Sequence, residues 1–308
     1  MAFGTPTSIS SDECKNKSIL IPKPFLKPYI FVQHGFDEWF GAPNCHFKYN
    51  HGPNIPVYNN KEMVGRYYED FVIDIRSGLS NFTELLKIEA LRYISQRAES
   101  KQPFFLYWTP DATHGPTYAS KEFRHQSQRG SAYGDAVREI DAAIGQILDL
   151  LHHLGIANNT LVVFTSDNGA ALVSAQEAGN NGPLMCGKQT TFEGGFRIPG
   201  IAWWPSRIMP NSVLSKPSTH MDLFTTLISQ AGMQIPSDRI IDGYDLSLDL
   251  GLVSPNDIIS HQNNQERSVF FYRGGLLMAV RHGHYKMHLW TWTTPVEELE
   301  KVRILSSY

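Results

Sequence analysis

The sequence predicts an α/β fold in which short apolar strands alternate with amphipathic helices. Runs rich in β-branched and aromatic residues occur at 103–108, 161–164 and 200–204, and turn-forming residues separate them from their surroundings. Stretches with apolar residues at helical spacing lie between and beside these runs. With 308 residues, of which 42% are hydrophobic and 19% charged, the chain is long enough to bury a core. Its length allows one or two domains.

The helices are predicted from the spacing of their apolar residues. Residues 83 to about 100 carry Leu85, Ile88, Leu91 and Ile94 on one face. Residues 135–154 carry a second apolar face, made by Val137, Ile140, Ile144, Ile147, Leu148 and Leu151. Gly155 follows as the expected C-terminal cap. Because this helix joins the strands at 104 and 161, we expect a βαβ-like unit with buried, parallel strands.

The second half of the chain predicts one more helix and three short strands. The helix covers residues 222–231, ends at Gly232, and has Leu223, Phe224 and Leu227 as its simplest core residues. The strand candidates are 269–272, 276–280 and 285–289, with turns at Gly274-Gly275 and His282-Gly283. Residues 211–218 and 254–265 are predicted surface loops.

Three histidines of this region, His282, His284 and His288, have no carboxylate partner in the pattern. We therefore expect them to face solvent and assign them no metal-binding role.

Asp167 and Asn168 form the first candidate site. They follow the 161–164 strand directly, within Thr165-Ser166-Asp167-Asn168-Gly169-Ala170. Ligands of open α/β sheets bind beyond the carboxyl ends of such strands. Carboxylate and amide oxygens suit Ca²⁺ or Mg²⁺, whereas a zinc site would use His or Cys. An ordinary Asp-Asn-Gly turn is the alternative interpretation.

Lys188 and His114 are the second and third candidates. Lys188 lies in a glycine-flanked loop, where its compact charge could bind a tetrahedral oxyanion such as sulfate or phosphate. His114 follows the 103–108 strand, where an imidazole could donate a proton near neutral pH. Taken singly, Lys188 could be an ordinary solvated lysine and His114 a packed or surface histidine. All three signals follow predicted strands, so they could converge on one rim of one sheet.

With these motifs, the chain resembles the sulfatase family. Ser166-Asp167-Asn168-Gly169 and the loop from Lys188 to Arg197 are similar to the general family pattern. Stretches around Trp39, Arg66 and Trp290 resemble the branch that removes 6-sulfate groups from N-acetylgalactosamine and galactose of chondroitin and keratan sulfate. The resemblance implies an alkaline-phosphatase/sulfatase-like mixed sheet flanked by helices, truncated at both ends. Residues 34–293 would be a partial catalytic domain, preceded by a non-matching segment (1–33) and followed by a non-matching tail (294–308).

The resemblance also implies roles for the candidate residues. Sulfatases attack sulfur with the hydrated aldehyde of a formylglycine, and a Ca²⁺ ion acts as Lewis acid. Asp167 and Asn168 would be two calcium ligands. Lys188 would bind the sulfate oxygens and offset charge on the bridging oxygen, and His114 would bind and protonate the leaving sugar hydroxyl.

The sequence departs from the family pattern at the nucleophile. The formylglycine arises from cysteine in a Cys-x-Pro-x-Arg motif, and none of Cys14, Cys45 and Cys186 begins that motif. The family's paired amino-terminal aspartates and its Lys-Trp-His-Leu-Gly segment also have no match. Calcium should bind weakly or not at all, because it normally takes about six to eight oxygen ligands. Loss of a covalent nucleophile costs on the order of 10⁶ in turnover, so we expect the chain to be inactive as written.

Composition limits the partners that we expect. A net charge of −3 provides no broad basic field for nucleic acid, and no apolar run reaches the roughly 18 residues of a membrane span. Recognition of a sulfated glycosaminoglycan would depend on Lys188 and nearby Arg or His. Family resemblance implies a lysosomal protein and a possible homodimer, although the first residues do not resemble a signal peptide. Glycosylation sequons occur at Asn16, Asn81 and Asn158.

Cys186 would pair, by resemblance, with a cysteine that this sequence lacks, so we expect an unpaired thiol.

Three functions remain open from the sequence. The first is a sulfatase-type hydrolase domain that is inactive or nearly so. The second is a metal-dependent phosphatase or phosphodiesterase, which would need a further nucleophile and more Asp or His ligands than the sequence shows. The third is a non-catalytic fragment that binds sulfated glycans or pairs with a full-length sulfatase chain.

Overall fold

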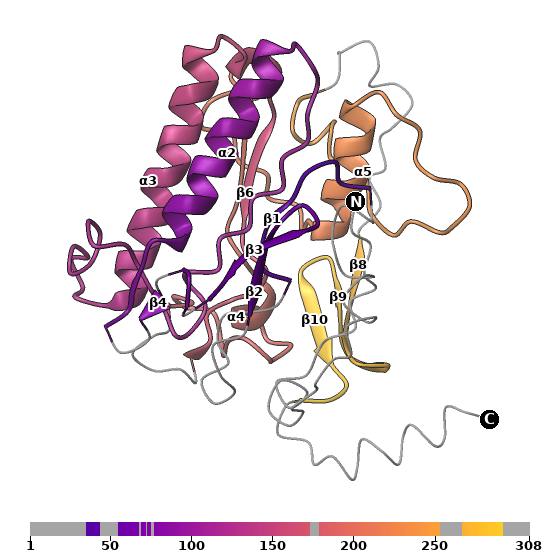
Figure 1. The fold of residues 1–308 in the computed structure, drawn as a ribbon. Helices are drawn as coiled ribbons and strands as arrows, with labels where there is room; N and C mark the ends of the chain where they lie inside the picture. Colours follow the sequence, from indigo (N-terminus) through magenta and orange to yellow (C-terminus); the bar gives the residue numbers. More distant parts are fainter. Residues whose placement is uncertain are drawn as a thin grey trace. The chain divides into compact units, whose positions relative to one another are not determined.

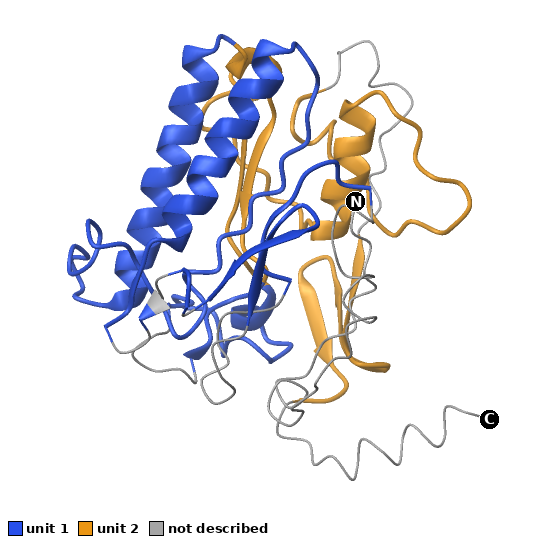
Figure 2. Ribbon diagram, viewed as in Figure 1, with its two compact units in different colours: residues 1–155, 168–196 blue, residues 156–167, 197–308 orange. Residues whose placement is uncertain are grey.

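The computed structural model describes residues 35–43, 55–67, 69–71, 73–74, 77–172, 179–252 and 267–291. The described part combines helices with small sheets, which confirms the predicted α/β class. It divides into two compact units, coloured separately in Figure 2. Unit 1 contains residues 1–155 and 168–196, and unit 2 contains residues 156–167 and 197–308. The loop predicted at 254–265 and the 294–308 tail lie outside the described residues, as do Cys14 and Cys45.

Unit 1 is built on two long helices that lie side by side, α2 (Phe82–Glu99) and α3 (Ala132–His153) (Figure 1). Both agree with the predicted helices, and Gly155 follows α3 with the positive φ (70°) of a C-terminal cap. Two small antiparallel sheets accompany them. One orders β1 (Phe40–Gly41), β2 (Pro56–Asn59) and β3 (Glu62–Arg66), and the other pairs β4 (Ile73–Asp74) with β5 (Leu79–Ser80).

The core of unit 1 centres on Phe82 at the start of α2. Tyr67 meets the Phe82 ring edge-on at a centroid distance of 4.8 Å, and Phe71 does so at 5.7 Å. Ala112 and Tyr118 belong to the same buried cluster. Because those two residues flank His114 in sequence, the loop that carries His114 is anchored in the core at both ends.

The buried face of α3 includes two carboxylates in addition to apolar side chains. Val137 is 40% exposed although it belongs to the predicted apolar face, whereas Asp135 and Glu139 are buried. Asp135 accepts hydrogen bonds from the backbone N–H groups of His125, Gln126 and Ser127 at 2.8, 3.1 and 2.7 Å. Helical spacing of apolar residues cannot reveal this arrangement, because polar side chains that hold a loop follow no hydrophobic period.

Asp135 should make unit 1 sensitive to acid. Burial acts to raise the pKa of Asp135, but the N–H groups of His125, Ser127 and Gln126 outweigh it and lower the pKa below its ordinary 3.8. A lowered folded-state pKa means stabilisation that is present above the unfolded value and lost as pH falls through the folded one. We expect Asp135→Asn to reduce the free energy of unfolding by about 2 kcal/mol at neutral pH.

Urea denaturation across a pH series would measure this effect. The difference in free energy of unfolding between the wild type and Asp135→Asn should narrow as pH falls below 3.8. Asp141→Asn, an exposed change on the same helix, is the control. A gap that stays constant down to the lowest pH would contradict the assigned role.

The described residues of unit 2 form two small sheets, one α-helix and the short 3₁₀ helix η4 (Ala157–Asn159). A two-stranded sheet pairs β6 (Val162–Thr165) with β7 (Gly200–Trp203), and the helix α5 spans His220–Gln230. A three-stranded antiparallel sheet orders β10 (Tyr285–His288), β9 (Leu276–His282) and β8 (Ser268–Arg273), which confirms the three predicted strands. Within that sheet region His282 and His284 are exposed and His288 is half-buried.

Two strand predictions are wrong in detail. β6 pairs antiparallel with β7, not parallel, and Phe164 on β6 is 37% exposed rather than buried. Residues 103–108 form no helix and pair with no strand in the described ranges, so the predicted βαβ unit is absent there. Their side chains still alternate, with Phe105 52% and Tyr107 64% exposed. The alternating exposure that is typical of a strand is therefore present, but the described residues provide no neighbouring strand.

The short helix α5 buries a different face from the one predicted. Leu223, Phe224 and Leu227 are only half-buried, whereas Asp222 and Thr226 are buried at 0% and 2% exposure. Hydrogen bonds explain the difference, because Thr226 Oγ1 donates to Asp222 O at 2.7 Å and accepts from Leu246 N at 2.9 Å. No helix in the described ranges is both long and apolar enough to cross a membrane.

Candidate functional site

Asn168 and Lys188 lie on two segments of unit 1 that are bonded to each other. Lys188 N donates to Ala170 O at 2.9 Å, and Gly169 N donates to Gly195 O at 3.0 Å. The segment after Asn168 is therefore tied to the Lys188 loop and to the short helix α4 (Glu193–Phe196). These contacts bring together two of the four predicted site residues, which are 20 positions apart in the sequence.

Four glycines allow these segments to approach so closely. A Cβ atom on Gly169 would lie 1.8 Å from Gly194 O, and one on Gly187 would lie 2.3 Å from Ala170 O. On Gly194 and Gly195 the corresponding distances are 2.0 Å to Cys186 O and 2.3 Å to Thr190 O. Only glycine fits backbone contacts of this kind. The glycines around Lys188 are thus required by packing, in addition to flanking a charged side chain.

Asn181 is a site-building residue that the sequence interpretation missed. Its Oδ1 accepts a hydrogen bond from Ala170 N at 2.8 Å, and its Nδ2 donates to Cys186 O at 2.8 Å. Asn181, which lies on a third segment, therefore holds the Asn168 and Lys188 segments together through hydrogen bonds. Asn180-Asn181-Gly182-Pro183 had the composition of a turn, which gave no sign of contacts beyond the turn itself.

The two predicted calcium ligands differ in their surroundings. Asn168 is half-buried, and its Nδ2 donates to Gly169 O at 3.0 Å. Asp167 is exposed and is the last residue of its segment in unit 2. The described residues contain no group of three or more His, Cys, Asp or Glu side chains that could hold a metal ion. Two oxygen side chains alone do not fit a tightly bound Ca²⁺.

Lys188 is half-buried, and its backbone is fixed on both sides. Besides the Lys188 N–Ala170 O bond, Thr190 donates to Gly187 O from both its backbone N (3.1 Å) and its Oγ1 (2.8 Å). Cys186, two residues before Lys188, is an exposed thiol with φ of 59°. The loop therefore presents a lysine from a rigid backbone, as an oxyanion site requires.

His114 lies in unit 1 on a loop of its own. His114 N donates to Asp111 O at 2.9 Å, and ring Nδ1 lies 2.8 Å from Gly115 O. A carbonyl oxygen can only accept, so Nδ1 carries the proton and Nε2 is the nitrogen that would exchange a proton with a ligand. Tyr118 donates to Asp111, and burial, together with the Asp111 charge, raises the pKa of Tyr118 well above its usual value.

His220 is a second residue that the sequence interpretation missed. Its Nε2 lies 3.2 Å from Thr165 Oγ1, and Thr165 Oγ1 also donates to Pro199 O at 3.0 Å. Thr165 ends β6, two residues before Asp167, so α5 and β7 both fix the strand end that leads into the candidate site. His220 opens α5, a position outside the apolar period on which the helix was predicted.

A sulfatase family model matches residues 10–233 of this chain, over the same segments that form this site. The chain belongs to the sulfatase family, whose members are sulfuric ester hydrolases. Its described architecture agrees with the alkaline-phosphatase-like fold of that family. The PsFucS1 sulfatase from Pseudoalteromonas sp. matches with a TM-score of 0.65 at 26% identity, covering 77% of this chain and 46% of that chain.

Among curated relatives, the chain is similar to N-acetylgalactosamine-6-sulfatases from several mammals. The Rattus norvegicus protein is 56% identical over 274 residues, which is 88% of this chain and 50% of the relative. The Homo sapiens protein is 53% identical, again over 88% of this chain and 50% of the relative. The chain thus spans about half the length of the curated relatives that it matches.

Proposed function

We propose that this chain is a sulfatase-type domain that binds 6-sulfated N-acetylgalactosamine or galactose units of chondroitin and keratan sulfate. The bonded pair of segments that carries Asn168 and Lys188 is the observation that supports it most, because it holds an amide oxygen and an ammonium group on one fixed backbone. The identity of over 50% with N-acetylgalactosamine-6-sulfatases supports the choice of sugar. Lysosomal location and glycosylation are part of the same proposal.

The roles of the four residues follow from their chemistry. Lys188 would bind sulfate oxygens, and His114 Nε2 would exchange a proton with the sugar oxygen. Asp167 and Asn168 would contribute two oxygens to Ca²⁺, which supplies Lewis-acid chemistry in the family. With only two such ligands, calcium binding by this polypeptide should be weak, with a dissociation constant of about 10⁻³ M or above.

Turnover by the 308-residue polypeptide alone should be undetectable. None of its three cysteines begins a Cys-x-Pro-x-Arg motif, so it has no position for the formylglycine nucleophile. Removing a nucleophile costs on the order of 10⁶ in turnover, or about 8 kcal/mol of barrier. His114 and Lys188 can stabilise charge and move a proton, but neither replaces the missing covalent step.

Titration with 6-sulfated N-acetylgalactosamine, paired with a turnover assay on an aryl sulfate, tests the proposal. We expect saturable binding that Lys188→Ala weakens at least tenfold, with no hydrolysis above the buffer rate. Lys121→Ala, an exposed change in unit 1, should leave binding unchanged. Equal binding by Lys188→Ala would contradict the site. Metal-dependent hydrolysis that disappears in His114→Ala would contradict the inactivity.

Pairing with a full-length sulfatase chain is the second candidate function. Residues 103–108 favour it, because they expose Phe105 and Tyr107 at alternating positions without a neighbouring strand in the described ranges. Such a segment can accept a strand from another chain. Co-purification with an intact sulfatase would support pairing, and substitution of Phe105 and Tyr107 by Lys should then abolish it.

A further inference from the structure

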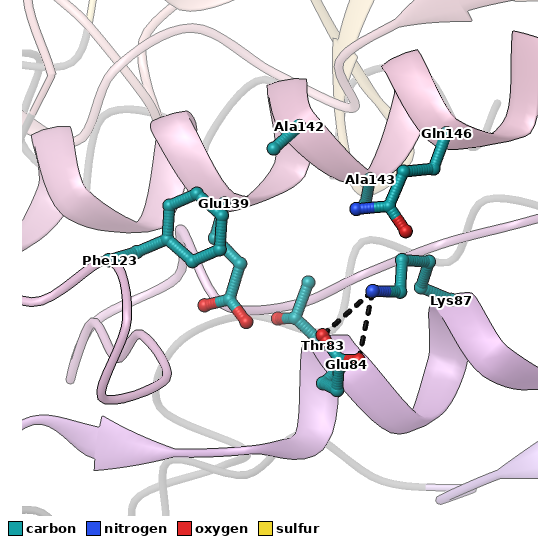
Figure 3. Close-up of a pocket in the computed structure, with 8 residues that line it drawn as sticks. All are labelled: Thr83, Glu84, Lys87, Phe123, Glu139, Ala142, Ala143 and Gln146. Atoms are coloured by element: carbon teal, nitrogen blue, oxygen red, sulfur yellow. Dashed lines mark hydrogen bonds and ion pairs between the residues drawn. The ribbon is translucent and has the colours of Figure 1, made fainter. Parts of the chain in front are cut away.

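A small cavity between the two long helices of unit 1 is lined mainly by polar side chains. Its volume is about 10 Å³, which is roughly the room that one water molecule needs. Figure 3 shows Glu139 of α3 on one side of it, with Thr83 and Lys87 of α2 on the other. None of the four predicted sulfate-site residues lines this cavity.

Two buried oxygens at this cavity have no hydrogen-bond partner in the described structure. They are Thr83 Oγ1 and Glu139 Oε1, and their residues are 0% and 2% exposed. Burial of a hydroxyl or a carboxylate oxygen without a partner is costly, so native proteins satisfy such atoms with protein or ordered water. A water-sized ligand in the cavity would be placed to satisfy both.

The ammonium group of Lys87 beside the cavity disfavours a metal cation there. Lys87 Nζ donates to both carboxylate oxygens of Glu84, at 2.9 and 2.8 Å, and an ammonium group has a third N–H to donate. A metal cation would lie beside this ammonium group. Burial raises the pKa of Glu139 above its ordinary 4.5, the hydrogen bond from Ser120 opposes it, and the smaller effects of the Glu84 and Lys87 charges act in opposite directions.

We propose that this cavity is a binding site for one water molecule that joins Thr83, Glu139 and Lys87. The water donates to Glu139 Oε1, shares a second hydrogen bond with Thr83 Oγ1, and accepts from Lys87 Nζ. Three bonds are typical of a buried water. The site is independent of the proposed sulfate chemistry.

The bound water has a consequence for the loop that follows His114. Glu139 Oε2 accepts a hydrogen bond from Ser120 N at 2.8 Å. The neighbouring Ala119 is bonded to β5 through Ala119 N–Gly78 O and Ser80 N–Ala119 O, both 3.0 Å. By holding Glu139 in one position, the water connects α2 to this loop across α3.

A crystal structure of the full chain at high resolution tests the site directly. We expect one density peak at about 2.7–3.2 Å from both Thr83 Oγ1 and Glu139 Oε1. A second crystal grown in rubidium chloride should show no anomalous signal there. The proposal is overturned if the cavity has no density, or if it holds rubidium.

Two matched threonine variants provide a solution test. Thr83→Val removes the hydroxyl that binds the water. Because Thr83 also belongs to the glycosylation sequon at Asn81, both variants and the wild type are compared as protein produced without N-glycosylation. We expect a fall in Tm of about 2–4 °C together with faster exchange of the Ser120 amide hydrogen. Thr83→Ser keeps the hydroxyl and should retain slow exchange. Thr117 is also buried, at 3% exposure, with an unpartnered Oγ1, but it does not line the cavity.

Thr117→Val should therefore leave Tm unchanged or raise it, because no bound water is lost. Equal Tm values for Thr83→Val and the wild type would overturn the proposal. So would the same fall in Tm for both valine variants.

Discussion

Replacing Gly169 by alanine is expected to reduce the free energy of unfolding by about 3 kcal/mol or more, at the upper end of overpacking effects. The added Cβ would lie 1.8 Å from Gly194 O and 2.9 Å from Gly194 C. Both are backbone atoms of α4, so relief requires movement of a whole segment rather than rotation of a side chain. Movement of that segment would break the Gly169 N–Gly195 O bond, which ties the Asn168 segment to α4.

Chemical denaturation of Gly169→Ala and Gly145→Ala would measure this difference. Gly145 lies inside α3, and a Cβ there meets nothing within 4 Å. Alanine at that position should stabilise the chain by about 0.5–1 kcal/mol, because it lowers the entropy cost of helix formation. If Gly169→Ala were as stable as Gly145→Ala, the tightly bonded pair of loops would not exist as described.

Substitution of Asp222 by asparagine is expected to cost about 3–5 kcal/mol in the stability of unit 2. Asp222 is 0% exposed and pairs with Arg267, whose side chain is 10% exposed. Its carboxylate also accepts from Thr219 N at 2.6 Å and Tyr244 N at 2.8 Å. Asparagine keeps the shape but leaves the buried guanidinium of Arg267 without a counter-charge.

Denaturation of a double variant separates lost charge pairing from lost packing. Asp222→Asn combined with Arg267→Met should be less destabilised than the sum of the two single changes, because no unpaired charge remains. Asp238→Asn, which disrupts an exposed pair with Arg239, should produce no measurable change. Strictly additive losses in the double variant would show that the ion pair does not couple the two residues.

The same helix links this ion pair to the candidate site. Asp222 forms a capping box with Thr219 at the start of α5, and His220 is the first residue of that helix. His220 contacts Thr165 at the end of β6. Asp222→Asn should therefore also loosen the strand end that leads to Asp167.

Elements whose signal is local were predictable from the sequence. The helix that precedes Gly155 and the three strands between 268 and 288 each depend on nearby spacing and turn residues, and the structure confirms them. Pairing between distant segments was not predictable in the same way. The 161–164 run has the composition of a buried parallel strand, yet its partner is β7 in antiparallel register.

In the candidate site, the chemical types of the residues were predictable from the sequence, whereas their contacts were not. Asn168 and Lys188 were selected for their chemistry, and hydrogen bonds bring their segments together. The contribution of Asn181 depends on backbone groups that are distant in sequence, which no local pattern encodes. The buried carboxylates Asp135 and Glu139 were missed for the same reason.

We propose that the Asn168 and Lys188 segments form a preorganised oxyanion site, in a 308-residue sequence that has no Cys-x-Pro-x-Arg motif. A crystal structure of the chain grown with calcium chloride and a 6-sulfated galactosamine tests it most directly. We expect sulfate oxygens within about 3.2 Å of Lys188 Nζ, an intact sulfate ester, and any bound calcium on Asp167 and Asn168. Sulfate bound elsewhere with Lys188 uninvolved, or a cleaved ester beside Lys188, would contradict it.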